Sequence, residues 1–266
     1  MLTIAGVGIG GGNPCRFVAE ISCNHGGDFD RCLRLIDAAK AAGADFLKTQ
    51  CYTPDELVAL RGDGPAPEPW GSQGWTMRTL YEKAQTPHEW FPRLVQHCRN
   101  AGLPWFSSVF GAQSLDLLWS LDCSAYKVAR LDNNSDALKA AILARGGKPI
   151  LISEENWFES AFRLDAGWRD VERLYCPRGY PPANIKLPFF QTEGYDHEGE
   201  SFFIGLSSHC LAPELPVAAV ARGCKLIEMH FQLDDEPSEL EANVSLTASK
   251  FEQMVLTVRR VEAMLG

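Results

Sequence analysis

The chain has 266 residues, of which 45% are hydrophobic and 10% aromatic, enough apolar material for a substantial core in one domain. With 25 Lys and Arg residues against 34 Asp and Glu, the formal charge is −9 and no basic patch is visible, so nucleic acid and anionic membranes are not expected partners. Neither a signal peptide nor an apolar run of roughly eighteen residues is visible, so we expect a cytoplasmic protein without a membrane span.

The nine cysteines are scattered, and neither their odd number nor their spacing indicates a disulfide framework. No close pair of cysteines stands opposite a second such pair, which argues against structural zinc. Several lie in or beside apolar runs, where cysteine behaves as a small hydrophobe. We therefore expect reduced cysteines in a reducing compartment.

Short β-type runs alternate with helical patterns along most of the chain, which is typical of parallel βα units. Eight such runs close a barrel more naturally than an open sheet, and the length matches the roughly 250 residues of a (β/α)8, or TIM, barrel. The predicted fold class is therefore α/β, a single-domain TIM barrel over residues 1–266. The expected strands are 17–21, 45–49, 104–108, 125–128, 149–153, 172–176, 202–207 and 226–231. The expected helices include 31–42, 87–101, 114–121, one that begins near Asn134 or Ser135, and 248–265.

Three segments depart from this alternation. The glycine-rich residues 1–14 are reminiscent of a dinucleotide-binding fingerprint, but a strand follows them instead of a helix, so a hairpin that caps the barrel floor is the preferred interpretation. The Pro- and Gly-rich residues 53–75 are too long for an ordinary connection and are expected to form a lid or an oligomer contact. Residues 154–171 carry little helical signal, so that unit is expected to be irregular.

Polar side chains fall at the carboxyl end of nearly every expected strand, which is the end where TIM barrels place their active sites. A single charged residue in an apolar strand can be structural, because burial is costly only when the charge is unpaired. A whole set that converges on one rim indicates a site. The set comprises Glu20, Lys48, Ser107, Ser108, Lys127, Ser153, Ser207, His209 and His230.

The residue types in this set indicate two kinds of chemistry. His209 and His230 end consecutive strands, so their imidazoles are expected to be neighbours, and two histidines with open positions suit a catalytic divalent ion of the manganese, zinc or iron type. Lys48 and Lys127 offer positive charge to a phosphate or carboxylate. Hydrogen bonds to the same anion are expected from Ser108, Ser153 and Ser207.

Several longer motifs follow one another along the chain. The series opens with FVAEISCNHGGD at 17–28, LIDAA at 35–39 and GADFLKTQ at 43–50, and continues with YTPD at 52–55, LYEKA at 80–84 and TPHEW at 86–90. It ends with FSSVF at 106–110, AYKVA at 125–129, GLSSH at 205–209 and IEMHF at 227–231. This ordered series resembles the sialic acid synthase family of N-acetylneuraminate and pseudaminic acid synthases, and the motifs from 52 to 90 are more similar to the pseudaminic branch.

The resemblance implies condensation of phosphoenolpyruvate with an open-chain 2-acetamido sugar to give a nine-carbon 3-deoxy-ulosonic acid. It implies that His209 and His230 hold a divalent metal, usually Mn²⁺ with Mg²⁺, Zn²⁺ and Fe²⁺ as alternatives, which polarises the aldehyde oxygen. Glu20 would orient or deprotonate the water that adds at carbon 2, and Tyr180 would contact the sugar. With Glu20, the implied catalytic residues are Lys48 and Lys127, and phosphoenolpyruvate would be held by these lysines with Ser108, Ser153 and Ser207.

The chain departs from the family pattern mainly where the family binds its acceptor. Arg178 replaces an asparagine, and Glu241 ends a Glu-Leu-Glu sequence that replaces a Gly-Pro-Asp turn. The family's C-terminal antifreeze-like domain, which contributes an arginine to the partner's site in a homodimer, is not expected in this chain. These departures predict an atypical, charged aldehyde as the acceptor, with Arg178, Tyr180 and Glu241 as candidate contacts.

Two further departures concern the anion. Arg130 stands near a position where the family has a small serine and is a candidate substrate contact. Glu154 and Glu155 replace a Thr-Gly pair, and Glu154 would oppose a phosphate unless it is paired. Three functions follow as alternatives: the atypical synthase, which we prefer, a metal-dependent aldolase or lyase with altered chemistry, and a non-catalytic barrel. The retained lysines and histidines argue against the last, and only the Glu154–Glu155 step separates the first two.

Overall fold

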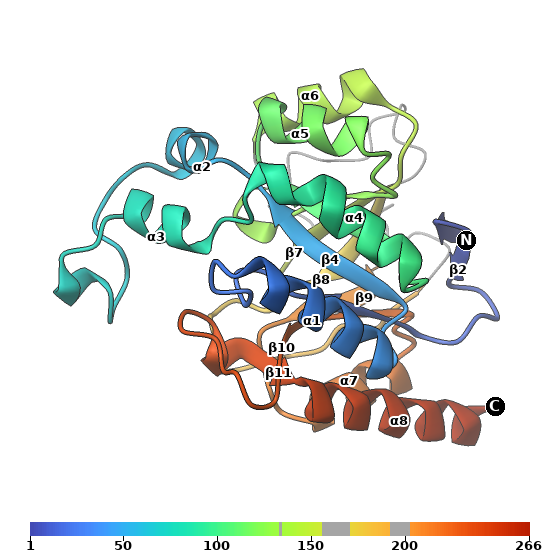
Figure 1. Cartoon of the computed structure of the whole chain (residues 1–266). Coiled ribbons are helices and arrows are strands. Elements are labelled where there is room, and N and C mark those ends of the chain that lie inside the picture. The colour runs from blue at the N-terminus through green and yellow to red at the C-terminus, as the bar shows by residue number, and fades with distance from the viewer. Residues whose placement is uncertain (133–134, 156–170, 192–202) are drawn as a thin grey trace.

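The computed structural model of the chain describes residues 1–132, 135–155, 171–191 and 203–266 (Figure 1). Eight strands in this part form one closed parallel barrel, because each strand pairs with the next and β10 pairs with both β9 and β3. The predicted TIM barrel is confirmed, and each predicted strand overlaps an observed one. The strands are β3 (Arg16–Glu20), β4 (Phe46–Cys51), β5 (Trp105–Val109), β6 (Tyr126–Val128), β7 (Ile150–Glu154), β8 (Val171–Tyr175), β9 (Phe203–Ser208) and β10 (Leu226–Gln232).

Helices cover the outside of the barrel between the strands (Figure 1). The first begins two residues earlier than predicted, because the Asp28 side chain accepts a hydrogen bond from the Arg31 backbone N–H at 3.0 Å and so caps it. The predicted helix 87–101 is divided into a 3-10 turn, η2 (His88–Trp90), and α4. The covering helices are α1 (Phe29–Ala41), α4 (Phe91–Asn100), α5 (Ala112–Ser120), α6 (Asp136–Arg145), α7 (Glu214–Ala221) and α8 (Ala248–Leu265). None of the helices that the structure describes is long and apolar enough to cross a membrane.

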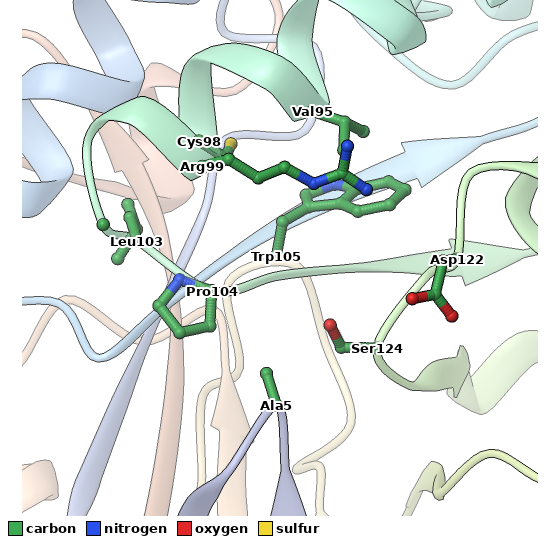
Figure 2. A pocket seen from close by; sticks show the side chains of 10 residues that line it. Ala5, Val95, Cys98, Arg99, Leu103, Pro104, Trp105, Asp122 and Ser124 are labelled. Atoms are coloured by element: carbon green, nitrogen blue, oxygen red, sulfur yellow. The ribbon is translucent and has the colours of Figure 1, made fainter.

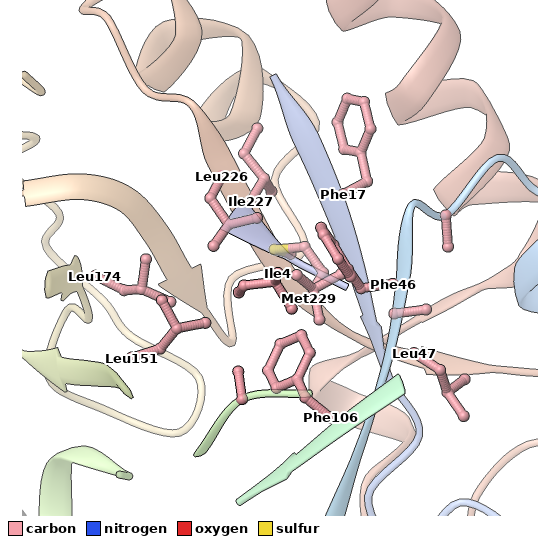
Figure 3. Close-up of a cluster of buried hydrophobic side chains, with 14 of the residues drawn as sticks. Ile4, Phe17, Phe46, Leu47, Phe106, Leu151, Leu174, Leu226, Ile227 and Met229 are labelled. Carbon is pink, nitrogen blue, oxygen red and sulfur yellow. The ribbon is translucent and has the colours of Figure 1, made fainter. Parts of the chain in front are cut away.

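The barrel interior carries an apolar layer directly below its polar rim. Phe46, Phe106 and Leu226 each lie two residues before a polar residue of the rim, so the strand period of two turns both toward the lumen. The Phe46 and Phe106 rings meet edge to face with centroids 5.9 Å apart. Figure 3 shows these side chains together with Leu151 and Leu174. A packed layer of this kind, and not a pore, lies below the polar rim.

A hairpin at the N-terminus packs against the other end of the barrel. Its strands, β1 (Leu2–Ile4) and β2 (Val7–Ile9), are antiparallel, and the turn between them uses positive φ angles at Ala5 and Gly6. Ile4 is fully buried in the core cluster of Figure 3. The Arg16 Nε at the start of β3 donates to the Gly8 carbonyl oxygen at 3.0 Å. The N-terminal end of the barrel is therefore covered by residues 1–9.

Part of the segment 53–75, expected as a lid or oligomer loop, is helical: α2 (Pro54–Arg61) and the 3-10 turn η1 (Gly71–Gln73) lie within it, and α3 (Met77–Ala84) follows. Thr53 and Glu56 form a capping box that begins α2. Arg61 at the end of α2 makes two hydrogen bonds to Asp132, with Nε–Oδ1 at 2.9 Å and Nη2–Oδ2 at 2.5 Å. These contacts anchor an arm of two helices to the barrel rim, from which it projects in Figure 1.

Phe251 on α8 offers a test of how the helix layer is held to the barrel. Its buried ring packs edge to face on Phe17 of β3 and Phe231 of β10, with centroid distances of 6.5 and 5.4 Å. Phe251→Ala is expected to lower the free energy of unfolding by about 3 to 5 kcal/mol, because it removes a large buried ring and leaves a cavity. Urea unfolding followed by circular dichroism measures this change.

The matched control is Met264→Ala in the same helix, where the side chain is 81% exposed. It is expected to change the free energy of unfolding by no more than about 0.5 kcal/mol. Equal effects of the two substitutions would contradict the packing described for α8.

Candidate active site

The strand register brings the predicted rim residues together. His230 of β10 is the register partner of Glu20 on β3, and Glu20 is the partner of Lys48 on β4. On the next two strands of the barrel, Ser108 of β5 is the partner of Lys127 on β6. Their side chains are all buried, with Lys48 only 3% and Lys127 only 2% exposed. The structure thus brings Glu20, Lys48, Ser108, Lys127 and His230 to one rim. Ser107 of the predicted set instead alternates to the outer face of β5, where its hydroxyl contacts Thr49.

The two lysines form the centre of the site. The Lys48 ammonium is paired with the Glu20 carboxylate and donates to Ser108 Oγ at 3.1 Å. The Lys127 ammonium donates to Ser153 Oγ at 2.7 Å. Both donors therefore lie beside serine hydroxyls that can share an anion with them, and the positive charge is held where bulk water does not reach.

A buried carboxylate that the sequence analysis did not assign lies between the lysines. Glu228 Oε1 is 3.2 Å from Lys127 Nζ and 3.5 Å from Lys48 Nζ, and it accepts a hydrogen bond from Ser207 Oγ at 2.9 Å. Glu228 lies two residues before His230 in the IEMHF motif, so the strand period that places His230 in the lumen also places Glu228 there. That spacing was the signal that could have identified it.

The charges in this cluster stabilise one another. Burial by itself raises the pKa of Glu228, but Lys127 and Lys48 outweigh it and hold that pKa at about 2. Burial also opposes the charge on Lys48, yet Glu20 and Glu228 raise its pKa above the ordinary value. The pKa of Lys127 is lowered, because its burial is not fully compensated by Glu228. Glu228 is therefore ionised across the physiological range.

The predicted histidine pair lies beside this cluster. The rings of His209 and His230 have centroids 4.9 Å apart, and the Tyr180 ring packs on His209 at 4.4 Å. Glu241 accepts a hydrogen bond from the Tyr180 hydroxyl, and its other oxygen lies 3.1 Å from His230 Nδ1. Burial and the nearby His230 lower the pKa of His209 to about 3, so its imidazole is neutral and free to bind a metal.

These donors fit a partly open metal site. Within the described residues, no three His, Cys, Asp or Glu side chains are arranged to hold a metal ion. The two neighbouring imidazoles are the donors that would hold an ion here, with water or substrate at its remaining positions. With Glu241 at Nδ1 of His230, Nε2 is the nitrogen left for an ion, and the carboxylate fixes the ring orientation.

Two candidate site residues, Arg130 and Arg178, lie farther from the lysine cluster. The Arg178 side chain is 62% exposed, and its Nε donates to Glu155 Oε2 at 2.8 Å. Arg130 begins the 3-10 turn η3 (Arg130–Asp132) after β6 and is half-buried, close enough to Cys176 after β8 to oppose a rise in the pKa of that thiol. The structure thus brings Arg130 near the strand ends and leaves Arg178 toward the outer rim.

Glu154 does not face the lumen. It follows Ser153, whose hydroxyl lies on Lys127, so the alternation of side chains turns Glu154 to the outer face of β7. There its Oε1 accepts a hydrogen bond from Arg173 Nη1 at 2.5 Å, and both side chains are buried. Glu154 is therefore paired and turned away from the lysine cluster, so it would not oppose a phosphate bound there.

A separate pocket of about 340 Å³ lies at the opposite end of the barrel (Figure 2). Its lining includes Ala5 of the N-terminal hairpin, Pro104 and Trp105 at the start of β5, and Asp122 and Ser124 before β6. None of the candidate site residues lines it. The chemistry therefore gathers at the carboxyl rim, where the polar side chains converge, and not in this pocket.

A closed parallel barrel with charged groups converging on its carboxyl rim defines a TIM-barrel enzyme. The NeuB family model matches residues 35–266, and the chain belongs to this family, which confirms the resemblance stated above. Pseudaminic acid synthase of Campylobacter jejuni is 35% identical over 94% of this chain and 74% of that protein. N-acetylneuraminate-9-phosphate synthase of Homo sapiens is 29% identical over 97% of this chain and 73% of that protein.

Solved structures share the same barrel. The spore coat polysaccharide biosynthesis protein SpsE from Bacillus subtilis superposes with a TM-score of 0.73 at 27% identity, over 99% of this chain and 72% of that one. N-acetylneuraminic acid synthetase from Leptospira borgpetersenii superposes with a TM-score of 0.77 over 100% and 90% of the two chains. At 22% identity, the second comparison shows the fold alone.

His25 in the loop after β3 gives the folding stability a measurable pH dependence. Its Nδ1 accepts a hydrogen bond from the Gly27 N–H at 3.1 Å, and its Nε2 lies 3.1 Å from Thr86 Oγ1. Burial, reinforced by Arg31, lowers the pKa of His25 to about 4. Because the unfolded chain takes up this proton near pH 6.5, the stability that neutral His25 contributes is lost as pH falls from 6.5 toward 4.

His25→Gln is expected to flatten this part of the stability curve. Between pH 7 and pH 4.5 the wild-type free energy of unfolding should fall by about 2 to 3 kcal/mol more than that of the variant. Urea unfolding at a series of pH values measures both curves. Parallel curves would contradict a buried, neutral His25.

Proposed function

We propose that this protein condenses phosphoenolpyruvate with a sugar-like aldehyde, in a reaction that needs a divalent metal, to give a 3-deoxy-ulosonic acid. The observation that carries the proposal is the adjacency of two clusters: Lys48 and Lys127 with their serines, and the His209–His230 pair. One cluster suits a phosphorylated carboxylic acid, and the other suits an ion that acts on a carbonyl oxygen. The names of two relatives, pseudaminic acid synthase and N-acetylneuraminate-9-phosphate synthase, support this reaction class.

In this proposal the strand residues bind phosphoenolpyruvate. Lys48 and Lys127 neutralise its phosphate and carboxylate, and Ser108, Ser153 and Ser207 donate hydrogen bonds to the same oxygens. Arg130 adds a guanidinium from the end of β6, which can contact a phosphate through two N–H groups. The buried lysines and their hydrogen-bonded serines hold the anion in one orientation, so that carbon 3 of the enol faces the mouth of the barrel.

His209 and His230 would hold the metal, for which we propose Mn²⁺, with Mg²⁺, Zn²⁺ and Fe²⁺ as the alternatives. A divalent ion bound there supplies Lewis-acid polarisation of the acceptor's aldehyde oxygen. Glu241 keeps the His230 ring in place through Nδ1. Tyr180, whose ring lies over His209, offers the acceptor a flat face to pack on.

The bond changes balance without an outside oxidant or reductant. Carbon 3 of phosphoenolpyruvate forms a bond to the aldehyde carbon, and carbon 2 becomes electron-poor. The aldehyde oxygen takes up a proton and becomes a hydroxyl. A water molecule adds at carbon 2 and gives up a proton, for which Glu20 is the proposed base. Cleavage of the bond between carbon 2 and the phosphate oxygen then releases phosphate and leaves the 2-keto acid. The backbone N–H of Ser22 donates to Glu20 Oε1 at 2.8 Å and fixes this carboxylate.

For the acceptor we propose an aldehyde that differs from the family's acetamido sugars and carries charge. The support lies in Arg178, Glu155 and Glu241, which are charged and stand at positions where the family pattern differs. A pocket built for particular polar groups rejects ligands that leave those groups unpaired. N-acetylmannosamine and the diacetamido sugars are therefore expected to be poor acceptors.

The proposed compartment is the cytoplasm, because all nine cysteines are free and eight of them are buried.

A phosphate-release assay tests the function. Purified protein is incubated with phosphoenolpyruvate, Mn²⁺ and a panel of neutral and charged aldoses that includes N-acetylmannosamine. We expect aldose-dependent phosphate release with at least one charged aldose, loss of this activity in Lys127→Met, and a weak response to N-acetylmannosamine. Turnover of N-acetylmannosamine on the order of 1 per second would refute the acceptor proposal, and no aldose-dependent release with any sugar would refute the function.

Metal binding can be tested without turnover. His209→Ala is expected to lose bound Mn²⁺, since one imidazole alone leaves the ion without a chelating pair. Elemental analysis and calorimetric titration of the folded protein measure this loss. His97→Ala on α4, where the ring contacts Asp37 at the surface, is the matched control and should bind as wild type does. Full metal content in His209→Ala would contradict the assignment.

A further inference from the structure

We propose that Glu228 is a counter-charge that weakens the hold of the barrel on anions, so that phosphate can leave after each turnover. This inference rests on the proposed function, because it concerns the same lysine cluster. It assigns Glu228 a positioning role, acting through Lys48 and Lys127 and not on the reacting atoms.

The contacts of Glu228 indicate this role. One of its oxygens, Oε1, lies within 3.5 Å of both lysine ammonium groups and also accepts the Ser207 hydroxyl hydrogen bond. Among the ion pairs of the described residues, Glu228 contacts both lysines, whereas Glu20 contacts Lys48. A single carboxylate oxygen thus draws together the two positive charges that would bind an anion.

Charge cancellation follows from this arrangement. Two buried ammonium groups without counter-charge would bind a phosphate dianion very tightly, because Coulomb attraction is strong where water is excluded. A negative charge held between the same ammonium groups repels the anion and so weakens its binding. Fast release of inorganic phosphate and tight binding of a phosphorylated substrate oppose each other, and Glu228 sets the balance between them.

A purely structural role of Glu228 predicts the opposite change in anion affinity. If Glu228 only held the lysines in place, any change there would disorder them and weaken anion binding. If it is a counter-charge, Glu228→Gln keeps hydrogen-bonding capacity and nearly the same volume, removes the negative charge, and strengthens anion binding. The direction of the affinity change therefore separates the two roles.

The experiment measures binding of inorganic phosphate to the full chain in a chelator, by calorimetry at two salt concentrations. We expect Glu228→Gln to bind phosphate at least about fivefold more tightly than wild type, with a steeper loss of affinity in high salt. Glu228→Asp, which draws the carboxylate back toward β10, should shift affinity in the same direction by a smaller factor. It also keeps the proposal testable if the Gln variant does not fold.

The matched control is Asp116→Asn on α5, which removes the same unit of charge from a side chain that is 61% exposed. It should change phosphate affinity by less than about twofold, because water and salt screen it. Unchanged or weaker phosphate binding in folded Glu228 variants would overturn the proposal.

The two proposals fail separately. Tighter phosphate binding in Glu228→Gln, without aldose-dependent phosphate release in wild type, would support the counter-charge and refute the synthase. Normal synthase turnover of the wild type, without a gain in phosphate affinity in Glu228→Gln, would support the synthase and refute the counter-charge. Slower steady-state turnover of Glu228→Gln, with a normal first turnover, is the further result expected if phosphate release becomes limiting.

Discussion

Two ammonium groups inside a barrel are tolerated only where carboxylates lie beside them, because an unpaired buried charge costs more than the few kcal/mol by which proteins are stable. Lys48 and Lys127 meet this condition through Glu20 and Glu228. Since these residues come from different strands, charge pairing helps to fix the strand register. A slip of one residue would turn a charged side chain toward the helix layer and leave its partner unpaired in the lumen.

The barrel and most of its rim could be predicted from the sequence, since buried parallel strands are apolar runs whose polar interruptions mark the lumen. The same rule would have assigned Glu228 to the lumen and Glu154 to the outer face, had the period of two been applied to each strand. Arg173 as the partner of Glu154 could not be predicted, because that contact depends on how β7 and β8 pair. For the arm, the many prolines and glycines favoured a loop, whereas in the structure a capping box at Thr53 begins α2.

In the proposed site, the groups for the anion and the groups for the acceptor come from different parts of the fold. The lysines and their serines come from strands, where a substitution disturbs both neighbours and the apolar layer below. Arg178 and Glu241 come from segments after strands, which tolerate change at little cost in stability. Under the proposed function, a change of acceptor would therefore leave the anion cluster undisturbed.

The covered N-terminal end of the barrel also bears on the order in which ligands would bind and leave. Residues 1–9 pack against the N-terminal end of the barrel, so a ligand of the lysine cluster would enter from the carboxyl rim. Tyr180, half exposed over His209, lies at that mouth, whereas Lys48 and Lys127 are nearly inaccessible. In the proposed site, a ligand resting on Tyr180 would lie nearer to solvent than one held by the lysines, so the deeper ligand would bind first and leave last.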